Sequence, residues 1–333
     1  MTDLLNLARR LGKSKIAVFG DLMLDDFTYG KVDRISPEAP VPIVEALFTE
    51  YKLGGCGNVA AGISDLGGEV YLFSVVGDDL YSGIVSGLLK SHSIINMTHK
   101  DSTRPTIRKN RVIAHNQQVS RTDWEKRHDI SADIEDMVIS QARDLLKEVD
   151  VIILSDYGKG FLTERLCRFL IDAANDNGKP VIVDPKAAFS KYKGATVITP
   201  NFKEFTEYEK IRKIERSAVS MFPYAKSAIS KYSLGALIVT MGEDGMVLFE
   251  KGRYAKVHAI QDGNEIADVT GAGDTVIGIY ALALAAGADY FNAMRIANYG
   301  AGVVVTKLGT ATCSLRELET AIGHDDGFEE VTA

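Results

Sequence analysis

The stretch DVTGAGDT combines two glycines and an acid directly before a long apolar run. Glycines at the first turn of a helix leave backbone N–H groups accessible, and the helix dipole attracts anions to that end. The carboxylate of Asp274 would repel a phosphate there unless a hydroxyl lay between the two groups. In that arrangement Asp274 accepts the hydroxyl proton, while the amides of Gly271, Ala272 and Gly273 stabilise the phosphoryl group under attack. A plain helix N-cap is the structural alternative.

Two other glycine-containing stretches carry less information. GKS at 12–14 ends like a P-loop, but Leu7 stands where that motif requires a glycine. GCGNVA at 55–60 matches the dinucleotide pattern GxGxxA, yet the preceding LFTEYKL is too polar for a central strand. A turn into a helix is one interpretation. The other is close approach of the backbone to a small ligand, with Asn58 as a hydrogen-bonding group.

The elements that must position these residues alternate between strands and helices. The pattern predicts an α/β fold with a doubly wound, mostly parallel sheet flanked by helices. Apolar, β-branched runs predict strands at 15–21, 70–79, 151–158, 180–185, 195–201 and 236–240. Helical patterns fall at 57–67, 80–91, 131–148, 163–175 and 211–231, and the tail 274–323 is mostly helical.

Polar residues end several of the predicted strands, and such sheets bind ligands at the carboxyl ends of their strands. These residues are Asp21, Asp156, Asp184, Asn201 and Thr240. Segments 22–49 and 103–122 do not fit the alternation and instead read as β-hairpins outside the main sheet. We therefore expect one domain spanning 1–333, with a small β-hairpin lid built from these two insertions.

Composition limits the possible partners. The chain has 333 residues, 46% of them hydrophobic, and a formal net charge of -7, which disfavours a general nucleic-acid binder. Its three separated cysteines predict neither a disulfide framework nor a zinc site. The N-terminus does not resemble a signal peptide, and the longest apolar run is shorter than a membrane span. We expect a cytoplasmic protein that does not enter a membrane.

Two longer stretches carry a family resemblance. GGCGNVAAGISDLGG and DVTGAGDTVIG resemble the two signature regions of the ribokinase-like (PfkB) sugar kinases, and the likeness covers almost the whole chain. More narrowly, GDLMLDDFTYG, RISPEAPVPIV, NQQVSRTDWE, LSDYGKG, VDPK, TPNFKEF and KLGTAT resemble the heptose 7-phosphate kinases. Those enzymes form D-glycero-β-D-manno-heptose 1,7-bisphosphate on the way to ADP-heptose. The resemblance is to the stand-alone kinase rather than to members with an added nucleotidyltransferase domain.

The resemblance implies ATP as phosphoryl donor, Mg²⁺, and a role for each matching residue. Asp274 is the implied catalytic base, and Gly271, Ala272 and Gly273 form the implied anion hole. Asn201 and Glu204 would order Mg²⁺ through water, although Glu204 could instead lie on a solvated helix face. The implied nucleotide residues are Lys186, Asn201, Glu204, Thr240, Gly242, Gly245 and Asn298, of which Asn298 could instead be a buried helix amide. Asp268 and Thr270 fall where the family often places a K⁺ loop.

The sugar end is assigned to Asp21, Asp25, Gly54, Gly55 and Asn58, since carboxylates and an amide suit vicinal hydroxyls. The two aspartates could instead shape a turn. Cations for a substrate phosphate come from the second insertion, which contains Arg104, Arg108, Lys109, Arg111 and Arg121. Strand alternation allows Lys109, Arg111 and Arg121 to share an inner face. A solvated edge that prevents aggregation is the alternative for each.

Four residues depart from the family pattern: Ile279 replaces a small residue, Cys56 and Gly57 stand in the first signature, and His115 replaces a basic residue. Other functions stay open, namely a kinase for ribose, fructose or fructose 6-phosphate, and a non-catalytic nucleotide- or sugar-binding regulator. A dinucleotide oxidoreductase is weaker still. A homodimer is expected because lids in this family often pair between subunits.

Overall fold

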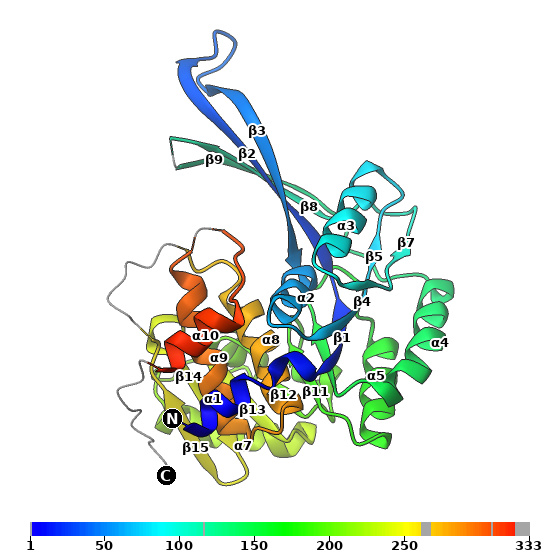
Figure 1. The fold of residues 1–333 in the computed structure, drawn as a ribbon, viewed down its shortest axis with the longest axis vertical. Helices are drawn as coiled ribbons and strands as arrows, with labels where there is room; N and C mark the ends of the chain where they lie inside the picture. Colours follow the sequence, from blue (N-terminus) through cyan, green and yellow to red (C-terminus); the bar gives the residue numbers. More distant parts are fainter. Residues whose placement is uncertain (1, 116, 261–267, 308, 324–333) are drawn as a thin grey trace.

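The computed structural model describes residues 2–115, 117–260, 268–307 and 309–323. Its main sheet has nine strands in the order β15-β14-β13-β12-β11-β10-β1-β4-β6 (Figure 1). All neighbours from β6 to β13 are parallel, whereas β14 pairs antiparallel with both β13 and β15. The strands are β1 (Lys15–Gly20), β4 (Glu69–Phe73), β6 (Ile95–Asn96), β10 (Val151–Ser155), β11 (Val181–Asp184), β12 (Val197–Ile198), β13 (Ala236–Thr240), β14 (Met246–Glu250) and β15 (Arg253–Val257).

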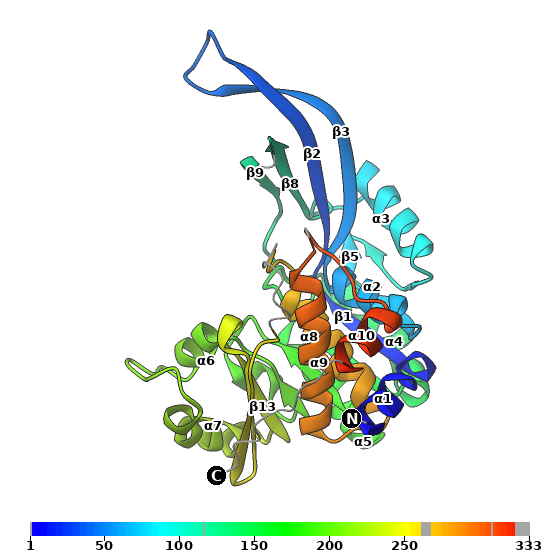
Figure 2. The same cartoon turned by 60° about the vertical axis from the view of Figure 1, so that its left-hand side comes forward.

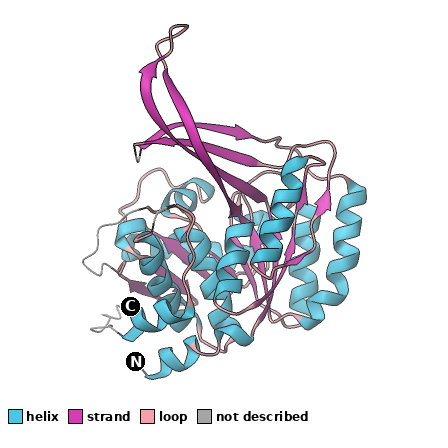
Figure 3. Ribbon diagram, turned by 45° about the horizontal axis from the view of Figure 1, so that its top comes forward, coloured by secondary structure: helices cyan, strands magenta, loops and turns pink. Residues whose placement is uncertain are grey.

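Helices cover both faces of this sheet, which confirms the predicted fold class (Figure 3). One face packs against α1 (Thr2–Ala8), α2 (Cys56–Asp65), α3 (Leu80–Ser91), α8 (Ala272–Ala285), α9 (Tyr290–Val305) and α10 (Leu315–Gly323). The other packs against α4 (Ala132–Glu148), α5 (Glu164–Asp176), α6 (Phe202–Tyr208) and α7 (Ala218–Tyr232). Strand residues alternate between the two cores: Ile16 faces the first and Ala17 the second. Burial on both faces explains why these strands are apolar throughout.

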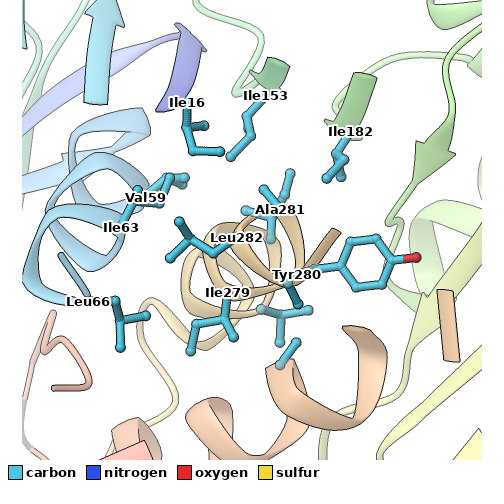
Figure 4. Close-up of a cluster of buried hydrophobic side chains, with 14 of the residues drawn as sticks. Ile16, Val59, Ile63, Leu66, Ile153, Ile182, Ile279, Tyr280, Ala281 and Leu282 are labelled. Atoms are coloured by element: carbon cyan, nitrogen blue, oxygen red, sulfur yellow. The ribbon is translucent and has the colours of Figure 1, made fainter. Parts of the chain in front are cut away.

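Helix α8 is enclosed along most of its length. Every residue from Asp274 to Ala283 is buried, and a helix that is apolar all round belongs in a core. Figure 4 shows Ala281 and Leu282 of this helix among Ile16 and Ile153 of the sheet and Val59 of α2. The first turn of α8 is therefore held by packing along the rest of the helix.

The unusual Ile279 is accommodated by a glycine on the neighbouring helix. A Cβ placed on Gly300 of α9 would lie 2.0 Å from Cδ1 of Ile279. The missing side chain on α9 thus leaves the space that the larger residue on α8 fills. This departure from the family pattern is a matter of helix packing, away from the first turn of α8.

A second sheet rises from the main body as an arm, seen most clearly in Figure 2. It contains β2 (Leu22–Ile35), β3 (Pro42–Gly55), β8 (Arg108–Ala114) and β9 (Gln117–Trp124), in the order β3-β2-β8-β9. Strands β2 and β8 pair in parallel, so the two insertions meet side by side. A further pair, β5 (Val75–Val76) and β7 (His99–Lys100), lies apart from both sheets.

Two local predictions were wrong, and one hairpin had not been predicted. The strand expected at 70–79 divides at Ser74 into β4 and β5, and the Ser74 hydroxyl donates to the Gly20 carbonyl and accepts the Leu22 amide. The helix expected at 211–231 begins only at 218, where Ser217 caps it. The hairpin of β14 and β15 was not anticipated, although Gly252 at its turn has the positive φ that favours glycine. Among the described residues, no helix has the length and apolar character needed to cross a membrane.

Candidate active site

The carboxyl ends of the main strands border a cleft of about 870 Å³. Its walls include all seven residues assigned to the nucleotide, together with Ala272 and Gly273: Lys186, Asn201, Glu204, Thr240, Gly242, Gly245 and Asn298. They come from five separate segments of the chain, which the parallel topology brings to one edge. The cleft therefore lies directly beside the glycine loop that begins α8.

Asp274 lies in the first turn of α8 with only 7% of its surface exposed. Its Oδ2 accepts a hydrogen bond from Nδ2 of Asn58 at 2.9 Å, and its Oδ1 accepts one from the Tyr157 hydroxyl at 2.6 Å. Burial raises the pKa of Asp274 to about 6, against the lowering effect of these two bonds. Such a carboxylate is mostly ionised at neutral pH and still basic enough to take a proton.

The glycine loop has the backbone geometry of an anion site, with one correction. Gly271 is the N-cap of α8 at φ 81°, and a Cβ there would lie 2.7 Å from Nδ2 of Asn58. The Ala272 amide donates to the Val269 carbonyl at 3.3 Å, so it is not one of the free donors we expected. Within the described ranges, the amides of Gly271 and Gly273 have no such acceptor. Gly273 is exposed toward the cleft, with no atom within 4 Å of the position of a Cβ.

Asp21 has a different role from the predicted one. It is buried, and its carboxylate accepts hydrogen bonds from the amides of Tyr157, Lys159 and Phe161 at 2.9–3.1 Å. Burial raises the pKa of Asp21, and these three bonds oppose the rise. Asp21 therefore fixes the loop after β10 and is not available as a sugar ligand.

Asp25 does lie at the junction of the two sheets, as the sugar assignment requires. Its carboxylate pairs with Arg111 at 2.6 Å, and both side chains are largely buried. A Cβ on Gly54 would lie 2.5 Å from Oδ2 of Asp25, so the glycine makes room for the acid. Gly55 has φ 57° and caps α2, which carries Asn58.

The cations of the second insertion divide into two groups. Strand register places Lys109, Arg111 and Arg121 on the face that also carries Asp25. Arg121 is engaged by Asp123 at 2.7 and 2.8 Å. Arg104 is buried against Asp101, and Arg108 packs between Tyr81 and Trp124, so neither joins the first group.

Lys109 is the least neutralised cation near Asp274. Within the described part of the chain it forms no ion pair, and its ammonium lies 5.7 Å from the centre of the Tyr157 ring. Burial lowers its pKa; Asp25 opposes this lowering, and Arg121, Lys159 and Arg111 reinforce it. A half-buried cation among other cations is a favourable place for an anionic ligand.

The NFKE stretch forms a capping box at the start of α6. The Asn201 side chain accepts the Glu204 amide at 2.9 Å, and Glu204 accepts the Asn201 amide at 3.2 Å. The other oxygen of Glu204 binds Lys186 at 2.8 Å. Glu204 is thus buried at the cleft wall and does not lie on a solvated face. Asn298 also lines the cleft, and its Nδ2 donates to the His258 carbonyl at 2.7 Å.

Asp268 joins the two loops that flank the glycine turn. It accepts the amide of Thr270 at 2.8 Å and that of Gly309 at 3.1 Å. Burial opposes ionisation of Asp268, but these bonds outweigh it and lower the carboxyl pKa. Among the described residues, no group of three or more His, Cys, Asp or Glu side chains is spaced to hold a metal ion directly.

Two residues of this region, Tyr157 and Lys159, were not predicted from the sequence, and Asp184 was expected only as a polar residue at a strand end. Asp184 lines the cleft. Its pKa is raised well above normal, mainly by burial and then by the nearby charges of Asp274 and Glu204. Lys159 pairs with Glu125 at 2.6 Å and adds to the charge near Lys109. LSDYGKG and VDPK overlap the ends of β10 and β11, where the sequence predicted only Asp156 and Asp184 as polar strand ends. The signal in the sequence that could have identified these residues was their position at the end of a predicted strand.

The remaining departures from the family pattern lie outside the reacting groups. Cys56 is a buried free thiol at the start of α2, and a Cβ on Gly57 would lie 2.5 Å from Leu22. His115 stands at the turn after β8 with φ 50°, and its Nε2 lies 3.3 Å from the Val32 carbonyl oxygen. Its place at the turn removes it from the cations near Asp25.

Comparison with known proteins gives one consistent result. The model of the pfkB family carbohydrate kinases matches residues 13–317. The Bifunctional protein HldE of Rhodopseudomonas palustris (strain BisA53) is 42% identical over 326 residues, covering 97% of this chain and 66% of that protein. The Bifunctional protein HldE of Coxiella burnetii (strain Dugway 5J108-111) is 42% identical over 314 residues, covering 93% and 64%. The chain thus spans 64–66% of the length of these relatives.

Solved structures share the fold at low identity. Arabidopsis thaliana ribokinase complexed with ribose and ATP superposes with a TM-score of 0.71 at 16% identity, covering 94% of this chain and 99% of that one. Phosphofructokinase-2 from Escherichia coli in complex with potassium gives 0.74 at 19% identity, covering 93% and 99%.

Proposed function

The chain belongs to the PfkB family of carbohydrate kinases, and we propose that it phosphorylates the anomeric hydroxyl of D-glycero-β-D-manno-heptose 7-phosphate at the expense of ATP. It is a phosphotransferase that acts on a sugar hydroxyl. The observation that carries the reaction is the buried carboxylate of Asp274 beside the amides of Gly271 and Gly273, for which the described residues offer no acceptor. The choice of sugar is supported by the resemblance to heptose 7-phosphate kinases and by Lys109, which lies near Asp25 and forms no ion pair with the residues that the structure describes.

The mechanism follows from the positions of these groups. The nucleotide would lie along the cleft, with its terminal phosphate toward Gly271 and Gly273. The sugar would lie on the other side of Asp274, under the second sheet, where Asp25 offers an acceptor for its hydroxyls. Asp274 orients and deprotonates the reacting hydroxyl, and the two glycine amides stabilise the charge on the transferring group. Closure of the second sheet would exclude water, which competes as an acceptor.

The family resemblance implies metal ions at two places. Mg²⁺ usually keeps several waters and takes one or two carboxylates with substrate phosphates, which suits Glu204 and Asn201 at the cleft wall. When bound, Mg²⁺ would neutralise phosphate charge. K⁺ would lie near Asp268 and Thr270, the positions at which the family resemblance implies a K⁺ loop.

A coupled ADP-release assay tests the proposed reaction. The rate with heptose 7-phosphate should exceed the rates with ribose and with fructose 6-phosphate, and it should require Mg²⁺ and rise with K⁺. A preference for ribose or fructose 6-phosphate would contradict the proposed substrate while leaving the sugar-kinase activity in place. No ADP release with any sugar would favour a binding protein instead.

Replacing Lys109 with methionine tests recognition of the substrate phosphate. A hydrogen bond to a charged group contributes about 1.5–3 kcal/mol, so KM for heptose 7-phosphate should rise roughly 10–100-fold. The same KM with unphosphorylated heptose should hardly change. Lys226→Met, an exposed lysine of α7, is the matched control. Equal losses with both sugars would show that Lys109 does not read the phosphate.

We also propose that the arm mediates a homodimer. Large apolar side chains on the arm are exposed, with Leu47 at 57% and Phe48 at 59%. Strand β3 is an edge of its sheet, and exposed apolar edges favour pairing with another chain. Sedimentation at micromolar concentration should show a dimer that Leu47→Glu converts to a monomer. A monomeric unmodified protein would contradict the proposal.

A further inference from the structure

Tyr157 makes the shortest of the hydrogen bonds that hold Asp274. Its hydroxyl donates to Oδ1 at 2.6 Å, while Asn58 donates to the other oxygen at 2.9 Å. A carboxylate has about four lone-pair positions on its two oxygens. The pair of donors therefore fixes the plane of the carboxylate and leaves positions free for a sugar hydroxyl.

The backbone of Tyr157 is held on both sides. Asp21 accepts the Tyr157 amide at 2.9 Å. The preceding Asp156 accepts the Gly158 amide at 2.7 Å and the hydroxyl of Tyr192 at 2.6 Å. Two buried acids thus lock the short loop that presents the phenol. This arrangement is costly to build for a side chain that merely fills space, because each acid had to leave water.

The Tyr157 ring also meets the second sheet. The Lys109 ammonium lies 5.7 Å from the ring centre, within the range of an attractive cation–π contact. Tyr157 also lines the cleft. Tyr157 therefore bonds Asp274, lines the cleft and contacts Lys109 of the second sheet.

We propose that Tyr157 is a positioning residue that orients the carboxylate of Asp274 for proton transfer and links it to Lys109 of the second sheet. The inference rests on the proposed role of Asp274 as the base. It predicts that the phenol hydroxyl contributes to catalysis without touching the transferred group, and that the ring keeps Lys109 near the sugar site.

The charges around Asp274 give the direction of the expected pH effect. Burial raises the pKa of Asp274; Tyr157 and Asn58 lower it through hydrogen bonds, Asp25 raises it, and Lys109 lowers it. Asp184 on β11 and the Cys56 thiol on α2 also face this group. Since the Tyr157 bond stabilises the charged form, its loss must raise the pKa of Asp274 and weaken activity at acidic pH first.

The test compares Tyr157→Phe with Tyr280→Phe. Tyr280 is buried on the same helix as Asp274, and its hydroxyl has no hydrogen-bond partner among the described residues. In Tyr157→Phe the acidic limb of kcat should move to higher pH by about one unit, with KM for ATP unchanged. In Tyr280→Phe the limb should stay in place.

A second measurement does not depend on activity. With ¹³C-labelled aspartate, the carboxyl resonance that disappears in Asp274→Asn identifies Asp274 and can be titrated in the free protein. It should titrate at higher pH in Tyr157→Phe than in the unmodified protein or Tyr280→Phe. An unchanged titration and an unchanged limb in Tyr157→Phe would overturn the inference.

Failure of the proposed function would give a different result from failure of the inference about Tyr157. If Asp274→Asn kept near-normal kcat, Asp274 would not be the base, and the role of Tyr157 in positioning it for proton transfer would fall as well. If Asp274→Asn is inactive but Tyr157→Phe behaves like Tyr280→Phe in both measurements, only the inference about Tyr157 is wrong.

Discussion

Asp274→Asn is expected to lower kcat by roughly 10²–10⁴-fold, the usual contribution of a general base. The reason is that an amide cannot accept the sugar proton, although it fills the same space. ATP binding should be nearly unchanged, because the nucleotide residues lie along the cleft and Asp274 is not among its walls. Steady-state rates and ATP titration on the same preparation would measure both effects.

The free energy of unfolding of Asp274→Asn should depend on pH in a way that controls for misfolding. The pKa of Asp274 is about 6 in the fold against 3.8 for an ordinary aspartate, a difference of about 3 kcal/mol. Because the pKa of Asp274 is raised in the folded protein, its ionisation destabilises the fold. This loss of stability grows as pH rises from about 4 to 6 and reaches its full size above pH 6. Asp274→Asn should therefore be up to about 3 kcal/mol more stable than the unmodified protein at pH 8. That gain should vanish near pH 4, and a destabilised variant at pH 8 would contradict the burial argument.

Gly273→Ala should cost about 10²–10³-fold in kcat, comparable to the loss of an oxyanion donor. Its Cβ would meet no protein atom within 4 Å and would project at the cleft wall, where the transferred phosphoryl group must approach the amide. The residue lies in the first turn of α8 without positive φ, so stability should not fall. Kinetics with thermal unfolding would separate these effects.

Gly87→Ala is the matched control for this substitution. Gly87 lies within α3, a Cβ added to it would also meet no atom within 4 Å, and it is remote from the cleft lining. It should gain about 0.5–1 kcal/mol from better helix propensity and keep full activity. If Gly273→Ala were as active as Gly87→Ala, the glycine loop would not hold the phosphoryl group.

Much of the fold could be predicted because its strands are buried on both faces. β1, β10 and β13 appear in the sequence as continuous apolar runs, and their order with the helices required a parallel sheet. The hairpin of β14 and β15 was not predicted because its residues also suit a core helix. Only the turn at Gly252 distinguishes a hairpin from a helix here. The pairing of β2 with β8 joins segments about 80 residues apart, a contact that no local pattern specifies.

The site was predictable where chemistry and topology coincide. Most of the cleft residues assigned to the nucleotide lie just after a strand or at a helix start, so a parallel sheet brings them together; Asn298, in the middle of α9, is the exception. Asp21 was misassigned because spacing cannot distinguish an acid that binds backbone amides from one that faces a ligand. Tyr157 was missed because its partner, Asp274, is 117 positions away.

A crystal structure with a non-hydrolysable ATP analogue and heptose 7-phosphate would test the central claim most directly. The reacting sugar hydroxyl should lie within about 2.6–3.2 Å of an Asp274 carboxylate oxygen, with the terminal phosphate beside the amides of Gly271 and Gly273. A carboxylate that contacts only Asn58 and Tyr157, with every sugar hydroxyl directed elsewhere, would contradict the account.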